Sequence, residues 1–120
     1  MKKLFPILAI TAMLLLMAAP AFAADAHTCD HNGRTIGSLR DCVQHAFDVG
    51  HITSKGVSDS LLAKLDAAQA AQDRGNNRAA INILRAFINE VNAQAGKKIA
   101  AGHALELVQH ANNVIGAPGG

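Results

Sequence analysis

Residues 80–95 read AINILRAFINEVNAQA, and this stretch decides the fold. Its apolar residues recur at intervals of three and four, which places their side chains on one face of a helix. The stripe consists of Ala80, Leu84, Phe87, Ile88, Val91 and Ala95, widened by Ile81 and Ile83. We therefore predict an amphipathic helix with Asn76 or Asn77 as its N-cap. It should end at Gly96, because glycine adopts the left-handed capping conformation at little cost.

Three further segments show the same periodicity, and each ends at a glycine: Gly50, Gly75 or Gly116. Ser38, in a capping box with the acidic residue three positions on, is the expected N-cap of the first, and Ser58 that of the second. The expected inner faces hold Leu39, Cys42, Val43, Ala46 and Phe47; Val57, Leu61, Leu62, Leu65, Ala68 and Ala71; and Ala104, Leu107, Val108, Ala111 and Ile115. No segment alternates like a strand, so we predict an all-α antiparallel bundle of about four short helices.

The N-terminus has the pattern of a cleaved signal peptide. Lys2 and Lys3 precede an apolar run over residues 4–17, and residues 21–23 (AFA) form a small-residue cleavage signal. The run is shorter than the roughly 18 to 20 residues that span a bilayer, and nothing resembling a second span follows. We predict that residues 1–23 are removed and that the mature protein is secreted or periplasmic.

Removal of this segment changes the composition of the chain. Two of the 11 lysines and arginines lie in it, so nine remain to balance nine acidic residues, and the 97 mature residues are formally neutral. Phe47 and Phe87 are their only aromatic residues, since the chain has no Trp or Tyr. A neutral chain without a basic stripe lacks the positively charged surface that binds nucleic acid or anionic lipid, and it has no Trp or Tyr to stack on bases. We expect neither nucleic acid nor, after cleavage, a membrane as partner.

Residues 24–37 (ADAHTCDHNGRTIG) are polar and rich in turn formers, and they are predicted to form a loop. Cys29 and Cys42 are expected to form a disulfide, because an exported chain with two cysteines usually pairs them. Closing a loop of this length contributes about 3 kcal/mol in the chain-entropy treatment. The bridge should staple the loop over a thin core. Residues 117–120 (APGG) are expected to be a flexible tail.

The stretch from Leu61 to Ile99, LLAKLDAAQAAQDRGNNRAAINILRAFINEVNAQAGKKI, resembles the central part of the FIMAH domain, an all-helical module of bacterial exported proteins. The points of similarity are the opening LLAKLDAA, the GN turn followed by AAINIL, and AFINEVNAQAGKKI. A looser similarity extends over residues 43–115, and we assign residues 38–116 to a FIMAH-like domain. The resemblance implies a module without established activity that usually forms part of larger secreted enzymes and surface proteins.

The chain departs from that family pattern in three ways. It shows no companion domain, which puts in doubt a role as accessory to an attached catalytic domain. It carries the pair Cys29 and Cys42, and Ala100 stands where a capping Ser or Thr is expected before the last helix. A tetratricopeptide-like hairpin over residues 61–94 is the alternative structural interpretation. One hairpin cannot bury its own apolar face, and no second copy follows at a period near 34 residues.

The sequence contains no catalytic motif. Ser54, Ser58 and Ser60 lie in a connector and at a helix start, where capping explains them. Glu90 and Glu106 are the only glutamates, and each lies on a different predicted helix. The metalloprotease, serine-hydrolase, phosphate-loop and C-x-x-C patterns are all absent. We therefore expect no catalytic residues, no cofactor and no enzymatic activity.

Six histidines raise the alternative of metal binding. His27 and His31 lie beside Cys29 in the predicted loop, and His45 and His51 could approach them through the first helix. Imidazole binds copper and zinc, but a tetrahedral site needs four convergent ligands, and the cysteines are expected to be paired with each other. Solvated loop residues are the other interpretation. Cleavage one residue later, after Ala24, would expose Asp-Ala-His, an amino-terminal copper chelator.

His103 and His110 lie seven positions apart on the last predicted helix. They share a face but are separated by about 10 Å along the axis, which is too far for both to hold one metal ion. We predict that both are exposed surface residues.

The predicted third helix carries a polar outer face rich in amides: Arg78, Asn82, Arg85, Asn89, Asn92 and Gln94. We expect this face, or the groove beside the preceding helix, to bind an unknown protein or polysaccharide outside the cytoplasm. An ordinary solvated helix face is the alternative interpretation. Metal binding through His27 and His31 is the alternative function, and neither the partner nor the oligomeric state is indicated.

Overall fold

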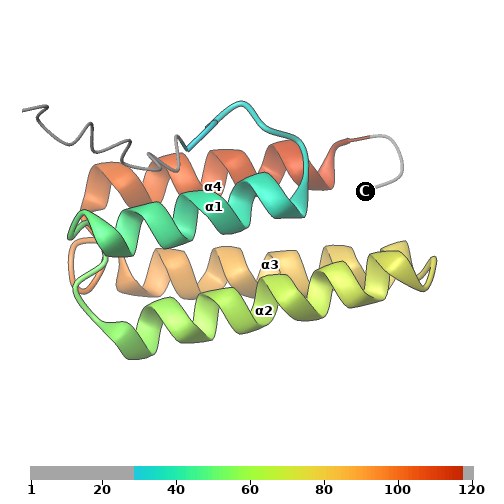
Figure 1. Ribbon diagram of the computed structural model, residues 1–120, viewed down its shortest axis with the longest axis horizontal. Coiled ribbons are helices and arrows are strands. Elements are labelled where there is room, and N and C mark those ends of the chain that lie inside the picture. Colours follow the sequence, from blue (N-terminus) through green and yellow to red (C-terminus); the bar gives the residue numbers. More distant parts are fainter. Residues whose placement is uncertain (1–28, 118–120) are drawn as a thin grey trace, which may run out of the picture.

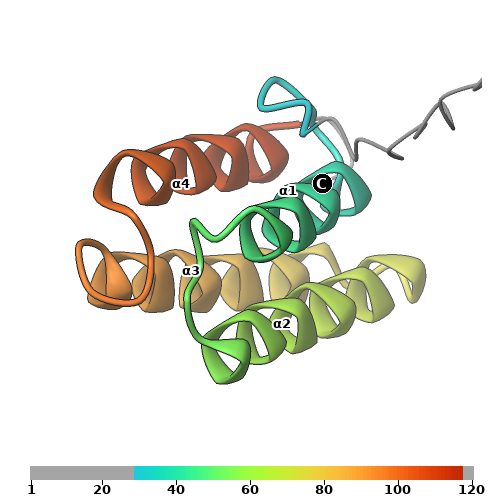
Figure 2. The same ribbon diagram turned by 60° about the vertical axis from the view of Figure 1, so that its left-hand side comes forward.

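The computed structural model describes residues 29–117. The predicted signal peptide at 1–23, His27 and residues 118–120 of the predicted tail lie outside the described residues. Four helices are present within them: α1 (Ile36–Asp48), α2 (Lys55–Asp73), α3 (Asn77–Gln94) and α4 (Ala101–Ile115). Each packs on the helix that follows it, and α1 also packs on α4, so the four form a closed bundle (Figures 1 and 2). No strand occurs in residues 29–117, and the all-α prediction is confirmed.

The first two helices begin earlier than predicted. The Thr35 hydroxyl accepts from Ser38 N at 3.0 Å, and the Ser38 hydroxyl accepts from Thr35 N at 3.4 Å, so Thr35 is the N-cap of α1. The buried Ile36 extends the apolar stripe toward the N-terminus, which favours this longer helix. Ser54 caps α2, and Ser58 lies buried one turn inside it. Both predicted caps were therefore wrong, Ser38 by three residues and Ser58 by four.

The first three helices end just before the glycines predicted from the sequence. Gly50, Gly75 and Gly96 have φ values of 85°, 75° and 73°, a left-handed conformation that other residues adopt only at a cost. At the start of α3, the Asn76 side chain accepts from Ala79 N at 3.1 Å, as a helix cap does. Ala100 precedes α4 without any side-chain capping bond, as expected from its chemistry.

The core contains few large side chains. Its bulkiest buried members are Leu39, Ile52, Leu61, Leu65, Leu84, Phe87, Ile99 and Leu107. Phe47 is only partly buried at the edge of the core, so Phe87 is the one fully buried phenylalanine among residues 29–117. Small buried residues such as Ala68 and Ala111 line the helix faces and let the axes approach closely.

The connections α1–α2 and α3–α4 pair with each other at one end of the bundle. Thr53 N donates to Lys98 O at 2.9 Å, and Ala100 N donates to His51 O at 2.9 Å. Ile52 and Ile99 lie between these bonds and are buried. This pairing holds His51 beside the first turn of α4.

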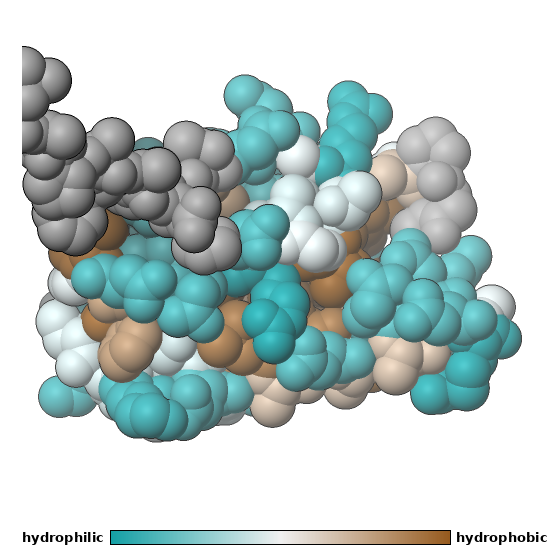
Figure 3. Space-filling view, viewed as in Figure 1, coloured by the Kyte–Doolittle hydropathy of each residue, from teal (hydrophilic) through white to brown (hydrophobic). Residues whose placement is uncertain are grey.

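Hydrophilic side chains cover most of the face seen in Figure 3, and hydrophobic surface shows only in places between them. Among residues 29–117, the large hydrophobic residues that stand exposed are Val49 and Leu105. None of the helices in residues 29–117 is long and apolar enough to cross a bilayer.

Candidate functional site

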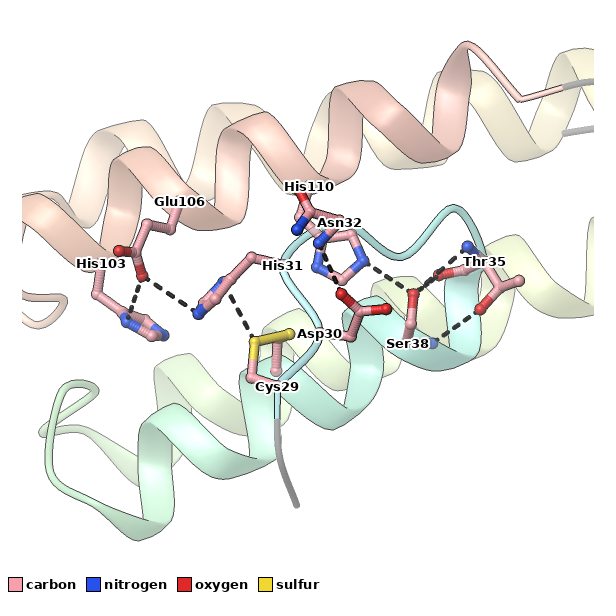
Figure 4. The surroundings of a disulfide bond; sticks show 10 residues. Cys29, Asp30, His31, Asn32, Thr35, Ser38, His103, Glu106 and His110 are labelled. Atoms are coloured by element: carbon pink, nitrogen blue, oxygen red, sulfur yellow. Dashed lines mark hydrogen bonds and ion pairs between the residues drawn. A yellow bond between two sulfur atoms is a disulfide. The ribbon is translucent and has the colours of Figure 1, made fainter. Parts of the chain in front are cut away.

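The predicted disulfide joins Cys29 to Cys42, with their Cα atoms 4.5 Å apart. Cys42 is buried on α1, whereas Cys29 belongs to residues 29–35, which we call the N-terminal strap. The strap runs beside the start of α1 and faces α4 (Figure 4). A Cβ atom at Gly33 would clash with the Ser38 side chain, so glycine allows this close approach.

Three histidines from distant parts of the chain, His31, His51 and His103, lie close together beside α4. Glu106 Oε2 lies 3.5 Å from His31 Nε2 and 3.3 Å from His103 Nδ1. Figure 4 shows the side chains of His31, His103 and Glu106 converging between the strap and α4. The His51 ring stacks on that of His103, with centroids 4.7 Å apart and planes 18° apart. His31, His51, His103 and Glu106 are called the histidine cluster below.

His103 is the most enclosed member of this cluster. Its side chain is 9% exposed, and its Nε2 atom is buried without a hydrogen-bond partner in residues 29–117. Burial lowers the pKa of His103, and nearby His51 lowers it further, while Glu106 acts in the opposite direction. The ring is therefore held toward its neutral form.

His110 is fully buried on α4 and contacts the start of α1. Its Nε2 atom lies 2.8 Å from Ser38 Oγ, while that hydroxyl donates to Thr35 O at 2.8 Å. Because the serine proton is already directed to a carbonyl, we assign the remaining bond to the imidazole Nε2–H as donor. The geometry differs from that of a serine nucleophile and its base, in which the serine proton is directed to the imidazole.

The prediction that His103 and His110 are exposed was wrong. Helical spacing showed that they share a face of α4, but the sequence pattern did not show that the strap and α1 cover this face. His27 lies outside the described residues, and His45 is a half-buried residue of α1. Only His31 of the predicted loop pair is therefore seen. Its Nε2 atom lies near Glu106 of α4, and its Nδ1 atom lies 3.2 Å from Cys29 Sγ.

Because His110 is buried, we predict that the folded protein loses stability in acid. Burial lowers its pKa in the folded chain, with His31 acting in the same direction and Asp30 of the strap opposing them. The unfolded chain therefore binds the proton more readily, and the free energy of unfolding should fall as the pH drops below about 6.5, the ordinary histidine value. The fall should level off once the lowered pKa of the folded chain is passed.

Thermal unfolding followed by circular dichroism between about pH 8 and about pH 5 measures this effect. We expect a smaller fall in Tm over that range for His110→Gln than for the parent, since glutamine can donate to Ser38 but does not titrate. An equal fall in both proteins would contradict the assignment to His110.

The predicted polar face lies along the outer side of α3. Arg78, Asn82, Arg85, Asn89 and Asn92 are all exposed, whereas Gln94 is half-buried near the helix end. Arg78, Asn82 and Arg85 line, with Ile81, an open hollow of about 440 Å³. Neither arginine forms an ion pair with another residue of 29–117.

The boundary between α2 and α3, which was the other predicted place for a partner, is bridged at one point by polar contacts. Glu90 of α3 accepts from Ser60 at 2.7 Å and from Lys64 at 3.3 Å. These contacts assign Glu90 a role in joining the helices, and sequence reasoning missed them. Opposite charges and a hydroxyl on two adjacent helices were the available signal.

A family model for the FIMAH domain matches residues 36–116. The match runs from the first residue of α1 to the C-cap of α4 and leaves out the strap with Cys29 and His31. No curated protein and no solved structure matches the chain. Because the matched region includes more than half of the sequence and all four helices, the chain belongs to the FIMAH domain family.

Proposed function

We propose that this protein is an exported, non-catalytic module that binds an acidic segment of another protein through the outer face of α3. The observation that carries the proposal is the pair Arg78 and Arg85, which are exposed, have no ion-pair partner within residues 29–117, and line the hollow with Asn82. The opposite face of α3 is fixed in the core by Leu84, Phe87 and Val91. The helix therefore holds the backbone positions of the two arginines at a fixed spacing.

The spacing of the two arginines favours an extended acidic partner. Seven residues of helix rise about 10 Å, which is close to one turn of three residues in a polyproline II chain, where side chains three apart point the same way. Guanidinium groups form paired hydrogen bonds with carboxylates, and Asn82 can contact the backbone between them. A protein partner is favoured over a polysaccharide because the chain has no Trp or Tyr, the residues that usually stack on sugar rings.

Export is supported by the signal-peptide pattern at residues 1–23 and by the disulfide. Structural disulfides form and persist in oxidising compartments, which include the bacterial periplasm and the cell exterior. Both features fit a protein that works outside the cytoplasm.

The double variant Arg78→Glu, Arg85→Glu tests the proposed face. A fluorescent peptide with two glutamates three positions apart is the probe, and anisotropy is the measurement. We expect at least a tenfold loss of affinity, because two attractive contacts become repulsive. Arg34→Glu, Lys97→Glu is the matched control, since it reverses two exposed charges elsewhere and should bind like the parent.

Two outcomes would contradict the proposal. Equal losses in both double variants would show attraction by net charge alone and would remove the assignment to α3. Tighter binding of a uronate polysaccharide than of the peptide, lost in the α3 variant, would retain the face but change the class of partner.

A further inference from the structure

The histidine cluster lies on the other side of the bundle from the proposed α3 surface and serves none of the contacts described there. Its members come from the strap, from the α1–α2 connection and from α4. Three separate constraints hold them: the disulfide beside His31, the bond from Ala100 N to His51 O at 2.9 Å, and the first turns of α4. Such convergence of imidazole and carboxylate groups is the donor set that zinc and related metals prefer.

The distances at Glu106 match those around a metal ion. With bonds of about 2.0 to 2.2 Å and tetrahedral angles, two ligand atoms on one zinc ion lie about 3.4 Å apart. Glu106 Oε2 lies 3.5 Å from His31 Nε2 and 3.3 Å from His103 Nδ1. The centroids of the two imidazole rings are 5.8 Å apart, against about 5 Å for two rings on one ion. Rotation of the His31 side chain, which is 41% exposed, can close this remaining gap.

The surroundings of His103 indicate which ring nitrogen faces the proposed site. Its side chain is more than nine-tenths buried, yet Nε2 has no partner among the described residues. In a neutral ring either Nε2 carries an unused lone pair, or it carries the proton and the Nδ1 lone pair faces the Glu106 carboxylate. One ring nitrogen therefore lacks a favourable contact in both tautomers. A cation between Nδ1 and Glu106 removes the repulsion in the second tautomer, and neutral imidazole is the form that binds metal. The Nε2–H group still has no partner among the described residues.

We propose that His31, His103 and Glu106 bind one divalent transition-metal ion, with His51 stacked on His103 to orient its ring. This site differs from the loop site predicted with His27, because the partners of His31 belong to α4. Cys29 and Cys42 also lie near His31, with ligand atoms within 4.8 Å of one another, but their sulfur atoms are bonded to each other. Two imidazoles and one carboxylate leave a fourth position open, as in catalytic rather than structural zinc sites.

Zinc titration by calorimetry tests the site. The protein is the untagged mature chain with its disulfide intact, carrying His27→Ala so that an amino-terminal chelator cannot contribute. We expect one Zn²⁺ ion per chain, with at least tenfold weaker binding in Glu106→Gln and in His31→Gln. Glu90→Gln, which changes the only other glutamate, and His45→Gln are matched controls and should bind Zn²⁺ like the parent.

Cobalt provides a second readout that does not depend on stability. Co²⁺ bound to His31, His103 and Glu106 should give the strong visible absorption of a tetrahedral ion, and Glu106→Gln should abolish it. Glu106 is 49% exposed, so this variant is expected to fold, and circular dichroism verifies it. Absence of saturable Zn²⁺ binding, equal affinity in Glu106→Gln and the parent, or loss of all binding on His27→Ala would overturn the proposal.

Discussion

Replacement of Phe87 by alanine is expected to lower the free energy of unfolding by about 3–5 kcal/mol. Phe87 is completely buried among the four helices and is the only such phenylalanine among residues 29–117. Its removal leaves a cavity in a core that already contains many small residues, such as Ala68 and Ala111. A domain of this size is stable by only about 5–15 kcal/mol, so the variant should lie near the limit of folding.

Urea unfolding followed by circular dichroism measures this loss, and Phe47→Ala is the matched control. Phe47 is the other phenylalanine among residues 29–117, and it is partly buried at the edge of the core. The same substitution there removes the same atoms but leaves a site open to solvent, so we expect a smaller loss. Equal losses at the two positions would show that Phe87 does not occupy the centre of the core.

Loss of the disulfide is expected to lower the free energy of unfolding by about 3 kcal/mol. Reduction gives the unfolded chain back the conformational freedom of a loop that the bond closes across 13 positions. The effect should also be local. The strap is joined to α1 through this bond, and it covers His103 and His110 on α4. Reduction should therefore increase amide hydrogen exchange in residues 29–35 and in α4 more than in α2 or α3.

Urea unfolding with and without a reducing agent measures the global loss. The double variant Cys29→Ala, Cys42→Ala is the control, since its stability should be low in both conditions and independent of the reductant. An unchanged unfolding midpoint on reduction of the parent would contradict the stapling role.

The sequence predicted the helices well because their determinants are local. The spacing of Leu84, Phe87 and Val91 defines the inner face of α3, and Gly75 and Gly96 end helices because of their own backbone preferences. N-caps were harder to place. Ser38 and Thr35 are both able to cap, and the choice depends on whether Ile36 is buried, which is a tertiary contact.

The two candidate sites also differ in whether local spacing or tertiary contacts determine them. Arg78, Asn82 and Arg85 fall on one stripe because residues three and four apart share a helix face. The histidine cluster instead depends on the path of the strap. The same holds for Ser38 and His110, which are in contact although 72 positions apart in the sequence. Periodicity carries no information about such pairs.

The two ends of the bundle differ in how much change in chain length they can absorb. At one end, Ile52 and Ile99 are buried and the two connections are hydrogen-bonded to each other, so an inserted residue would displace both. At the other end, the turn at residues 74–76 is exposed, and its backbone bonds reach only to the last turn of α2 and the first turn of α3. Evolutionary insertions and engineered fusions should therefore collect at this turn, close to Arg78 of the proposed binding face, where added residues leave the core undisturbed.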